Sequence, residues 1–503
     1  MSPLPQFYLL PSSPSFTCLD RFSLSPSPPS SPSPLGYPDP SAPVPFWPIL
    51  TSLLTSPITS APSLISTLET IALTLTGTTA PATNHDLLHH TLDQNPSFFP
   101  AIWPAIATLA LEMPTLFPSG SLPVLGRDNT HREISLSRRQ AACLVVHQFL
   151  RTLRAPAWRG DGAHDFGIWY GREQRQESAA GAYLGAVMGY FGGVVAGLGL
   201  GGGLEKGEEE GGEGDKGERR VVYTLHSGGE SLPNDGEGCP LAAVEVLVVE
   251  EYDLLPGSLG IPGGAMVVSA NKDVGFGQSA TQEEIHVGTS PEACPAVLVT
   301  PTLEDDQVLV IQGAQAMVNL VGQRRDIRVE PMKTPDGGVQ SWRERRMLFM
   351  DALELDLVER GSEGDSDGEH TLPDLRPGNV DREIRKAYTA FSLGGFTEVR
   401  TGLWGCGAFC GDPVVKFLIL WYAASLARVS LAVVCDKQSQ AVASGLKEFI
   451  LSISGHPSFR DAGGIKTLLG RAATCCIFPQ TISWFKQALE SNSGKRFDIY
   501  LGT

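Results

Sequence analysis

The sequence predicts an α/β domain that follows a helical region, and two observations carry this prediction. Between residues 221 and 503, short apolar runs alternate with stretches of helical periodicity. Runs of that kind are typical of strands buried on both faces of a sheet. Between residues 46 and 200, apolar residues recur at helical spacing instead. We therefore expect a sheet covered by helices on both faces, preceded by an all-helical accessory domain.

The composition of the chain narrows the function classes. The chain has 503 residues, a formal net charge of −17 and a sequence pI of about 5.1. Such an acidic protein is poorly suited to direct nucleic-acid binding, because Lys and Arg must neutralise the phosphates. An anionic ligand would have to be held by local backbone N–H groups. The nine cysteines lack metal-ligand spacing, which favours a reduced, intracellular protein.

Composition also divides the chain into segments. Residues 1–45 are rich in Pro and Ser, and we expect them to be disordered. Residues 46–200 form the predicted helical domain, and residues 201–220 are a Gly/Glu-rich linker or loop. Residues 221–503 form the predicted α/β domain. Within it, the acidic insert at 358–370 is expected to be a solvated loop.

The helical region has one clear N-terminal signature and one ambiguous segment. Ser137 and Gln140 form a capping-box pattern ahead of an apolar run. No strand is obvious before about residue 220. Ala179–Leu204 is uncharged and long enough to span a bilayer, but glycine dominates its second half. We therefore expect a buried helix from Ser178 to about Val195 and no membrane span.

The α/β domain alternates strands and helices. We expect strands at 219–227, 242–255, 264–271, 295–301, 306–314, 345–355 and 430–436. We expect helices within 281–288, 381–395 and 412–429.

A glycine loop follows a short strand that ends near Arg400. Asp412 and Pro413 then form the N-cap and first position of a helix. A strand, a glycine loop and a helix N-terminus together can bind an anion, because free N–H groups converge there. An ordinary strand-to-helix connection remains an equal alternative from spacing alone. The loop matches neither the Rossmann fingerprint nor the P-loop.

A second segment with the same layout lies upstream, at 269–284. The stretch GFGQSATQEE follows a predicted strand, and Thr281 with Glu284 forms another capping-box pattern. Taken alone, this is a loop followed by a capped helix. Two such loops at strand carboxyl ends, however, predict a ligand-binding crevice in an α/β sheet.

Two histidines, His85 and His89, have spacing that can hold a metal on a helix. No third ligand follows in a suitable place, so we expect no metal there.

Several motifs resemble the poly(ADP-ribose) glycohydrolase family, and the shorter glycine loop resembles a filamentous-fungal-type variant. These motifs extend in the family's order from about residue 46 to about residue 450: SRRQAACLVVHQFL, ANK (270–272), VGFGQSATQEE, QGA (312–314), REIRKAY (382–388) and TGLWGCGAFCGD (401–412). The resemblance implies a macrodomain-like mixed sheet with a helical accessory domain. It also implies hydrolysis of ribose–ribose bonds in ADP-ribose polymers, without cofactor or metal.

The resemblance also implies roles for individual residues. Glu284 would be the general acid/base, while Glu283 and Asn271 would bind the scissile ribose. Adjacent glutamates on a helix point about 100° apart, so only one can act on the bond. The remaining substrate-binding residues implied are Gly275, Gly277, Gln282, Gly405, Cys406, Gly407, Ala408 and Phe409, which would cradle the diphosphate and the distal ribose.

Departures from the family pattern motivate an alternative function. Val268 replaces an Asp of vertebrate-type members, and Phe276 interrupts the loop where they have only glycine. Aromatic residues expected near Gly322 and at 433–435 are also missing. The alternative is an ADP-ribose polymer reader that has lost catalysis. A third hypothesis is an unrelated, metal-dependent phosphate enzyme.

The same resemblance implies the partners. We expect binding to poly(ADP-ribose) and to poly(ADP-ribosyl)ated proteins, no membrane partner, and a monomer in the nucleus, the cytoplasm or both.

Overall fold

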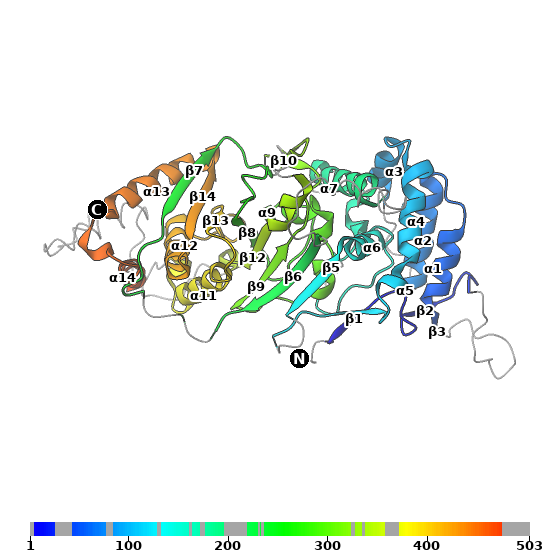
Figure 1. Ribbon diagram of the computed structural model, residues 1–503, viewed down its shortest axis with the longest axis horizontal. Coiled ribbons are helices and arrows are strands. Elements are labelled where there is room, and N and C mark those ends of the chain that lie inside the picture. The colour runs from blue at the N-terminus through cyan, green and yellow to red at the C-terminus, as the bar shows by residue number, and fades with distance from the viewer. Residues whose placement is uncertain are drawn as a thin grey trace, which may run out of the picture.

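Figure 1 presents the structure of the chain, which is a computed structural model. It describes residues 5–25, 43–76, 84–127, 132–159, 163–171, 177–195, 219–229, 232, 236–322, 327–333, 338–357 and 372–474.

An eight-stranded mixed sheet forms the centre of the molecule (Figure 1). In spatial order its strands are β5 (Glu133–Ser137), β6 (Arg220–Ser227), β9 (Gln307–Gln312), β12 (Arg346–Asp351), β8 (Gly264–Ala270), β13 (Glu398–Thr401), β14 (Ser430–Asp436) and β7 (Val244–Val249). The pairs from β5 to β12 are antiparallel, and those from β12 to β7 are parallel.

Both faces of this sheet are buried, and the alternation of side chains along β12 demonstrates it. Met347 and Phe349 belong to one hydrophobic core, whereas Leu348 and Met350 belong to another. Successive strand residues point to opposite faces, so the two cores lie on opposite sides of the sheet. This explains why the strands read as continuous apolar runs.

Helices supply the other half of each core. Buried residues of α6 (Arg138–Phe149), α7 (Glu177–Tyr190) and α9 (Gln282–Gly288) belong to the first core. Buried residues of α11 (Asn379–Phe391), α12 (Pro413–Ala427), α13 (Gln440–Ile453) and α14 (Gly463–Thr474) belong to the second core. The predicted α/β fold class, with helices on both faces and a helical region before it, is therefore confirmed.

The N-terminal region packs its helices at one end of the molecule (Figure 1). They are α1 (Phe46–Thr55), α2 (Ala61–Thr76), α3 (Asp86–Asp93), α4 (Trp103–Leu111) and α5 (Met113–Leu116). The capping box at the start of α6 is confirmed, with Gln140 N–H donating to Ser137 Oγ at 3.2 Å. None of the described helices is long and apolar enough to cross a membrane.

The prediction that no strand precedes residue 220 is wrong. The short strands β1 (Phe7–Leu9), β2 (Thr17–Leu19), β3 (Pro43–Pro45) and β4 (Ser121–Pro123) pair there, and β5 joins the central sheet. Strands of three residues are too short to show a period of two.

The expected disorder of residues 1–45 is also wrong for residues 5–25. Leu10 and Phe16 are fully buried in the first core despite their Pro- and Ser-rich surroundings. Of the predicted linker, residues 201–218 lie outside the described part, as does the insert at 358–370. Arg219 and Arg220 belong to the folded sheet region. The boundaries of the four predicted segments otherwise stay predictions.

One predicted strand is a helix. Residues 295–301 contain the short helix α10 (Ala296–Val299), which is completely buried. A buried apolar run of this length cannot be assigned to strand or helix from its pattern alone. Two further short strands, β10 (Asn319–Val321) and β11 (Arg328–Glu330), form a separate hairpin.

Candidate active site

Two glycine loops leave the sheet at neighbouring points. The first glycine loop, residues 274–281, follows β8, and the second glycine loop, residues 402–412, follows β13. β8 and β13 are adjacent and parallel, with Glu398 paired to Gly264, so their carboxyl ends lie at the same edge. The two loops therefore start side by side, and the ligand-binding crevice between them stays a prediction.

Glu284 is held at the first turn of α9 by a capping box. Its Oε2 accepts hydrogen bonds from Thr281 N–H at 2.9 Å and from Ser279 N–H at 2.8 Å. Its Oε1 occupies the space beside Gly277, because a Cβ at that glycine would lie 1.9 Å from it. Glycine is thus required at 277 for this carboxyl group to sit here.

Glu283 points in a different direction and is buried. Its carboxylate accepts from Asn271 N–H at 2.9 Å and from Gly275 N–H at 2.8 Å. Burial raises the pKa of Glu283 to about 8, while these two N–H groups and the Arg159 charge act to lower it. The two adjacent glutamates therefore occupy distinct environments. Through its two hydrogen bonds, Glu283 joins Asn271, at the end of β8, to Gly275 in the first glycine loop.

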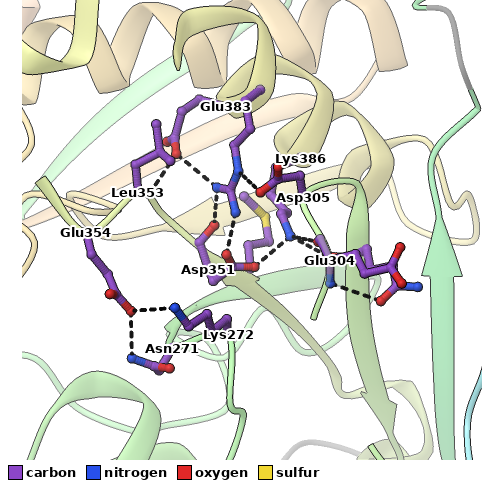
Figure 2. A network of polar contacts seen from close by, with 12 residues as sticks. Asn271, Lys272, Glu304, Asp305, Asp351, Leu353, Glu354, Glu383 and Lys386 are labelled. Atoms are coloured by element: carbon purple, nitrogen blue, oxygen red, sulfur yellow. Dashed lines mark hydrogen bonds and ion pairs between the residues drawn. The ribbon is translucent and has the colours of Figure 1, made fainter. Parts of the chain in front are cut away.

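Gln282 and Asn271 make contacts within the protein. The Gln282 side chain accepts from Ser269 N–H at 3.0 Å and so bonds to the end of β8. The Asn271 amide donates to Glu354 at 3.3 Å (Figure 2). Asn271 Oδ1 also accepts from Asp273 N–H at 3.0 Å. Asn271 and Glu354 follow the adjacent parallel strands β8 and β12.

The second glycine loop presents its tip to solvent. Gly407 and Ala408 are exposed, while Cys406 is partly buried and Phe409 packs against the second core. Gly405 has a φ of +72°, a conformation that favours glycine. The structure thus places the five predicted residues of this loop in one continuous turn ahead of α12.

Each glycine loop carries a run of free backbone donors. Among the described residues, none accepts a hydrogen bond from the N–H groups of Phe276, Gly277 and Gln278. The same holds for the consecutive N–H groups of residues 407–409. Consecutive free amides can bind an anion where the turn directs them to one point.

A buried ionic cluster lies beneath the second glycine loop. The Lys416 ammonium is 2.6 Å from Glu383 and 3.4 Å from Asp374. Asp374 in turn accepts from Asp412 N–H at 2.8 Å, at the N-cap of α12. Burial raises the pKa of Asp374, and the nearby Lys416 charge acts to lower it.

Polar contacts connect this cluster to the end of β8, the strand that precedes the first glycine loop. Glu383 accepts from Leu353 N–H at 2.8 Å, next to Glu354, which binds Asn271 (Figure 2). Figure 2 also shows Lys386, which contacts Asp351 at 2.6 Å. The ends of β8 and β12 and the start of α12 are therefore joined by polar contacts.

The helical region contributes residues that the sequence analysis did not select. Arg159 donates to Val274 O at 2.5 Å, and Trp169 Nε1 donates to Gly277 O at 2.7 Å. Tyr183 is buried near Glu284. Burial raises the pKa of its phenol, and the Glu284 charge adds to this effect. These residues precede the loop by about a hundred positions, and no local pattern marks them.

The residues that depart from the family pattern are buried or have a nearby aromatic side chain in the structure. Val268 is fully buried in the first core, and Phe276 is 3% exposed. Tyr252, which follows β7, contacts the two segments in which the sequence lacks the family's aromatic residues, near Gly322 and at 433–435. Its hydroxyl donates to Val434 O at 3.0 Å, and its carbonyl accepts from Gly322 N–H at 3.2 Å.

The histidines of the N-terminal region have ordinary surroundings. His85 is buried beside Tyr170 with ring centroids 5.7 Å apart, and His89 pairs with Asp93 at 2.9 Å. Within the described residues, no three His, Cys, Asp or Glu side chains are grouped to hold a metal.

Two protein-family models match the chain. A model of the poly(ADP-ribose) glycohydrolase catalytic domain, with the Macro domain fold, matches residues 258–443. A model of the same family's helical domain matches residues 91–208, and together the two cover more than half of the chain. The chain belongs to the poly(ADP-ribose) glycohydrolase family. Both glycine loops lie within the matched catalytic domain, and Arg159, Trp169 and Tyr183 lie within the matched helical domain.

Curated relatives in the glycohydrolase family match part of the chain. Poly(ADP-ribose) glycohydrolase 2 of Caenorhabditis elegans is 32% identical over 161 residues, 30% of this chain and 32% of the relative. Poly(ADP-ribose) glycohydrolase 1 of that species is 30% identical over 170 residues, 31% and 21% of the two chains. The Arabidopsis thaliana protein is 26% identical over 231 residues, 33% and 42%. The matched part thus spans less than half the length of each relative.

Solved glycohydrolase structures match more loosely. The enzyme from Deinococcus radiodurans in complex with ADP-ribose is 14% identical and has a TM-score of 0.25, over 50% of this chain and 95% of that one. The enzyme from Thermomonospora curvata is 13% identical with a TM-score of 0.24, over 42% of this chain and 79% of that one. Superpositions this loose do not establish a shared fold, which here follows from the family models and the sheet itself.

Proposed function

We propose that this protein is a metal-independent poly(ADP-ribose) glycohydrolase that hydrolyses ribose–ribose bonds and releases ADP-ribose. The observation that carries the proposal is the placement of the Glu284 carboxyl group beside a loop with three successive N–H groups that donate to no described residue. A second loop of the same kind leaves the adjacent parallel strand. Family membership and this pairing of carboxyl group and anion cradle support the same reaction.

Glu284 performs both proton transfers in the proposed mechanism. Its Oε2 already accepts two N–H bonds, so the carboxyl proton is carried on Oε1, beside Gly277. That proton passes to the leaving ribose oxygen as the glycosidic bond breaks, through an oxocarbenium-like state. Water then adds to the anomeric carbon, and the Glu284 carboxylate takes its proton.

The other predicted residues bind and orient substrate. Free amides at 276–278 and 407–409 receive the diphosphate, and Phe409 places the distal ribose. Glu283 and Asn271 contact the scissile ribose, and the Tyr252 ring borders the nucleotide. Neither proton transfer requires a metal ion, because a carboxyl group serves as acid and then as base.

The test is incubation of the full chain with labelled poly(ADP-ribose), with and without EDTA, followed by product sizing. We expect conversion to ADP-ribose that EDTA does not slow. Glu284→Gln should abolish turnover while ADP-ribose binding stays measurable, and the exposed Glu250→Gln should leave both unchanged. Full turnover by Glu284→Gln would refute the assigned acid/base.

The alternative, a polymer reader, has its own outcome in this assay. A reader would bind ADP-ribose saturably and release no product on prolonged incubation. Loss of turnover on EDTA treatment would instead favour a metal-dependent enzyme.

A further inference from the structure

The first glycine loop is held by the helical region through its backbone carbonyls. Trp169 Nε1 donates to Gly277 O at 2.7 Å, and Arg159 donates to Val274 O at 2.5 Å. The Gln278 side chain returns a hydrogen bond to Ile168 O. Three contacts from residues more than a hundred positions away thus fix a loop of eight residues.

Aromatic packing reinforces these hydrogen bonds. The Phe276 ring centroid lies 5.7 Å from that of Phe166 and 5.2 Å from that of Trp169. Phe166 and Trp169 are themselves stacked at 5.0 Å, and both are fully buried. Phe276 therefore anchors the loop from its middle, which accounts for a bulky residue in a glycine loop.

A hydrogen bond that holds the carbonyl of one residue also fixes the direction of the N–H of the next residue, because both groups belong to the same planar peptide. In a trans peptide, the C=O and the following N–H point in opposite directions. Arg159 holds Val274 O, and the Gly275 N–H accordingly points to Glu283, at 2.8 Å. Trp169 holds Gly277 O in the same way, so Gln278 N–H points away from the helical region. No described residue accepts a hydrogen bond from it.

We propose that Trp169 is a positioning residue of the active site: its indole N–H orients the Gly277–Gln278 peptide so that Gln278 N–H donates to a diphosphate. The inference rests on the proposed function for the identity of the ligand, but the orientation itself does not. The helical region then takes part in ligand binding without touching the ligand.

The test compares two identical substitutions in the full chain. Trp169→Phe keeps an aromatic ring against Phe276 and removes the N–H donor. Trp421→Phe removes an equivalent indole bond, to Ala242 O at 3.0 Å, far along α12 from either glycine loop. The readouts are thermal unfolding, amide hydrogen exchange in peptides covering 274–281, and the affinity for ADP-ribose and for inorganic diphosphate.

We expect both variants to lose similar stability. Only Trp169→Phe should accelerate exchange at 274–281 and weaken both ligands, by about tenfold, the value of one hydrogen bond. It should raise KM for polymer more than it lowers kcat. Unchanged exchange in Trp169→Phe would overturn the positioning role. Faster exchange with unchanged affinity would overturn the role of Gln278 N–H. If the unsubstituted protein binds neither ligand, the proposed function fails, while the exchange comparison still decides whether Trp169 orients the loop.

Discussion

The two glycine loops follow adjacent strands, yet they are held in place by different forces. The first glycine loop is fixed from outside, by Trp169 and Arg159 and by the burial of Phe276 among aromatic rings. The second glycine loop is fixed from beneath, by Lys416 and its buried carboxylate partners. The first glycine loop therefore depends on hydrogen bonds and apolar packing, and the second depends on ion pairing.

The largest expected effect is on the ionic side. Lys416→Met leaves Asp374 buried without its cation and leaves Glu383 with Arg382 alone, which should cost about 3–5 kcal/mol in the free energy of unfolding. Chemical denaturation measures this. The control is Lys437→Met, whose pair with Glu250 is exposed, and which should change stability by less than about 1 kcal/mol. Equal effects in the two variants would mean that the buried cluster does not stabilise this region.

The next largest effect concerns the chemistry beside the first glycine loop. Gly277→Ala places a Cβ 1.9 Å from Glu284 Oε1, so the carboxyl group must move. If Glu284 is the acid/base, we expect turnover to fall about a hundredfold, because a displacement of about 1 Å can cost this much in rate. Gly407→Ala is the counterpart in the second glycine loop, where a Cβ meets nothing within 4 Å. If Gly407→Ala also lowered turnover by more than a few-fold, the two glycine loops would not differ in their tolerance of a side chain.

A smaller effect is expected from pH. Burial raises the pKa of Glu283 from its ordinary value near 4.5 to about 8. The folded state therefore binds this proton more tightly than the unfolded chain, and the stability gained is fully present below about pH 4.5 and lost as the pH rises through 8. Unfolding free energies measured across this window should fall with pH, and less steeply in Glu283→Gln. An identical slope in the variant would show that another group titrates.

The smallest effect is expected on the apolar side. Phe276→Leu keeps an apolar residue in the aromatic cluster but loses ring contacts, and should cost about 1 kcal/mol in the free energy of unfolding. Denaturation at two salt concentrations should give the same loss, since no charge is involved. A salt-dependent loss would contradict apolar anchoring.

The parts of the site that the sequence predicted are local ones. The capping boxes at Ser137 and Thr281 are patterns within four residues, and the structure contains both. The glycine loops and the described strands of six or more residues were likewise predictable from neighbouring residues. The assigned roles in substrate binding and catalysis remain predictions.

The parts that the sequence missed depend on distant contacts. Trp169 and Gly277 are 108 positions apart, and the loop carbonyl that Trp169 binds has no side chain to reveal it. Lys416 reads as an ordinary helix residue until Glu383 is brought against it. The strand wrongly predicted at 295–301 shows a related limit, because a short, fully buried apolar run fits a helix as well as a strand.

The placement of β5 bears on how the chain is made. β5 lies in the helical region, but its partner β6 is synthesised 85 residues later, counting from Ser135 to Arg220. At about 5–20 residues per second, roughly 4–17 s pass on the ribosome before the pair can form. During that time the nascent β5 presents open backbone groups that other chains can join. Variation in the length of the intervening Gly/Glu-rich segment should therefore alter yield and chaperone demand in cells while leaving the activity of each folded molecule unchanged.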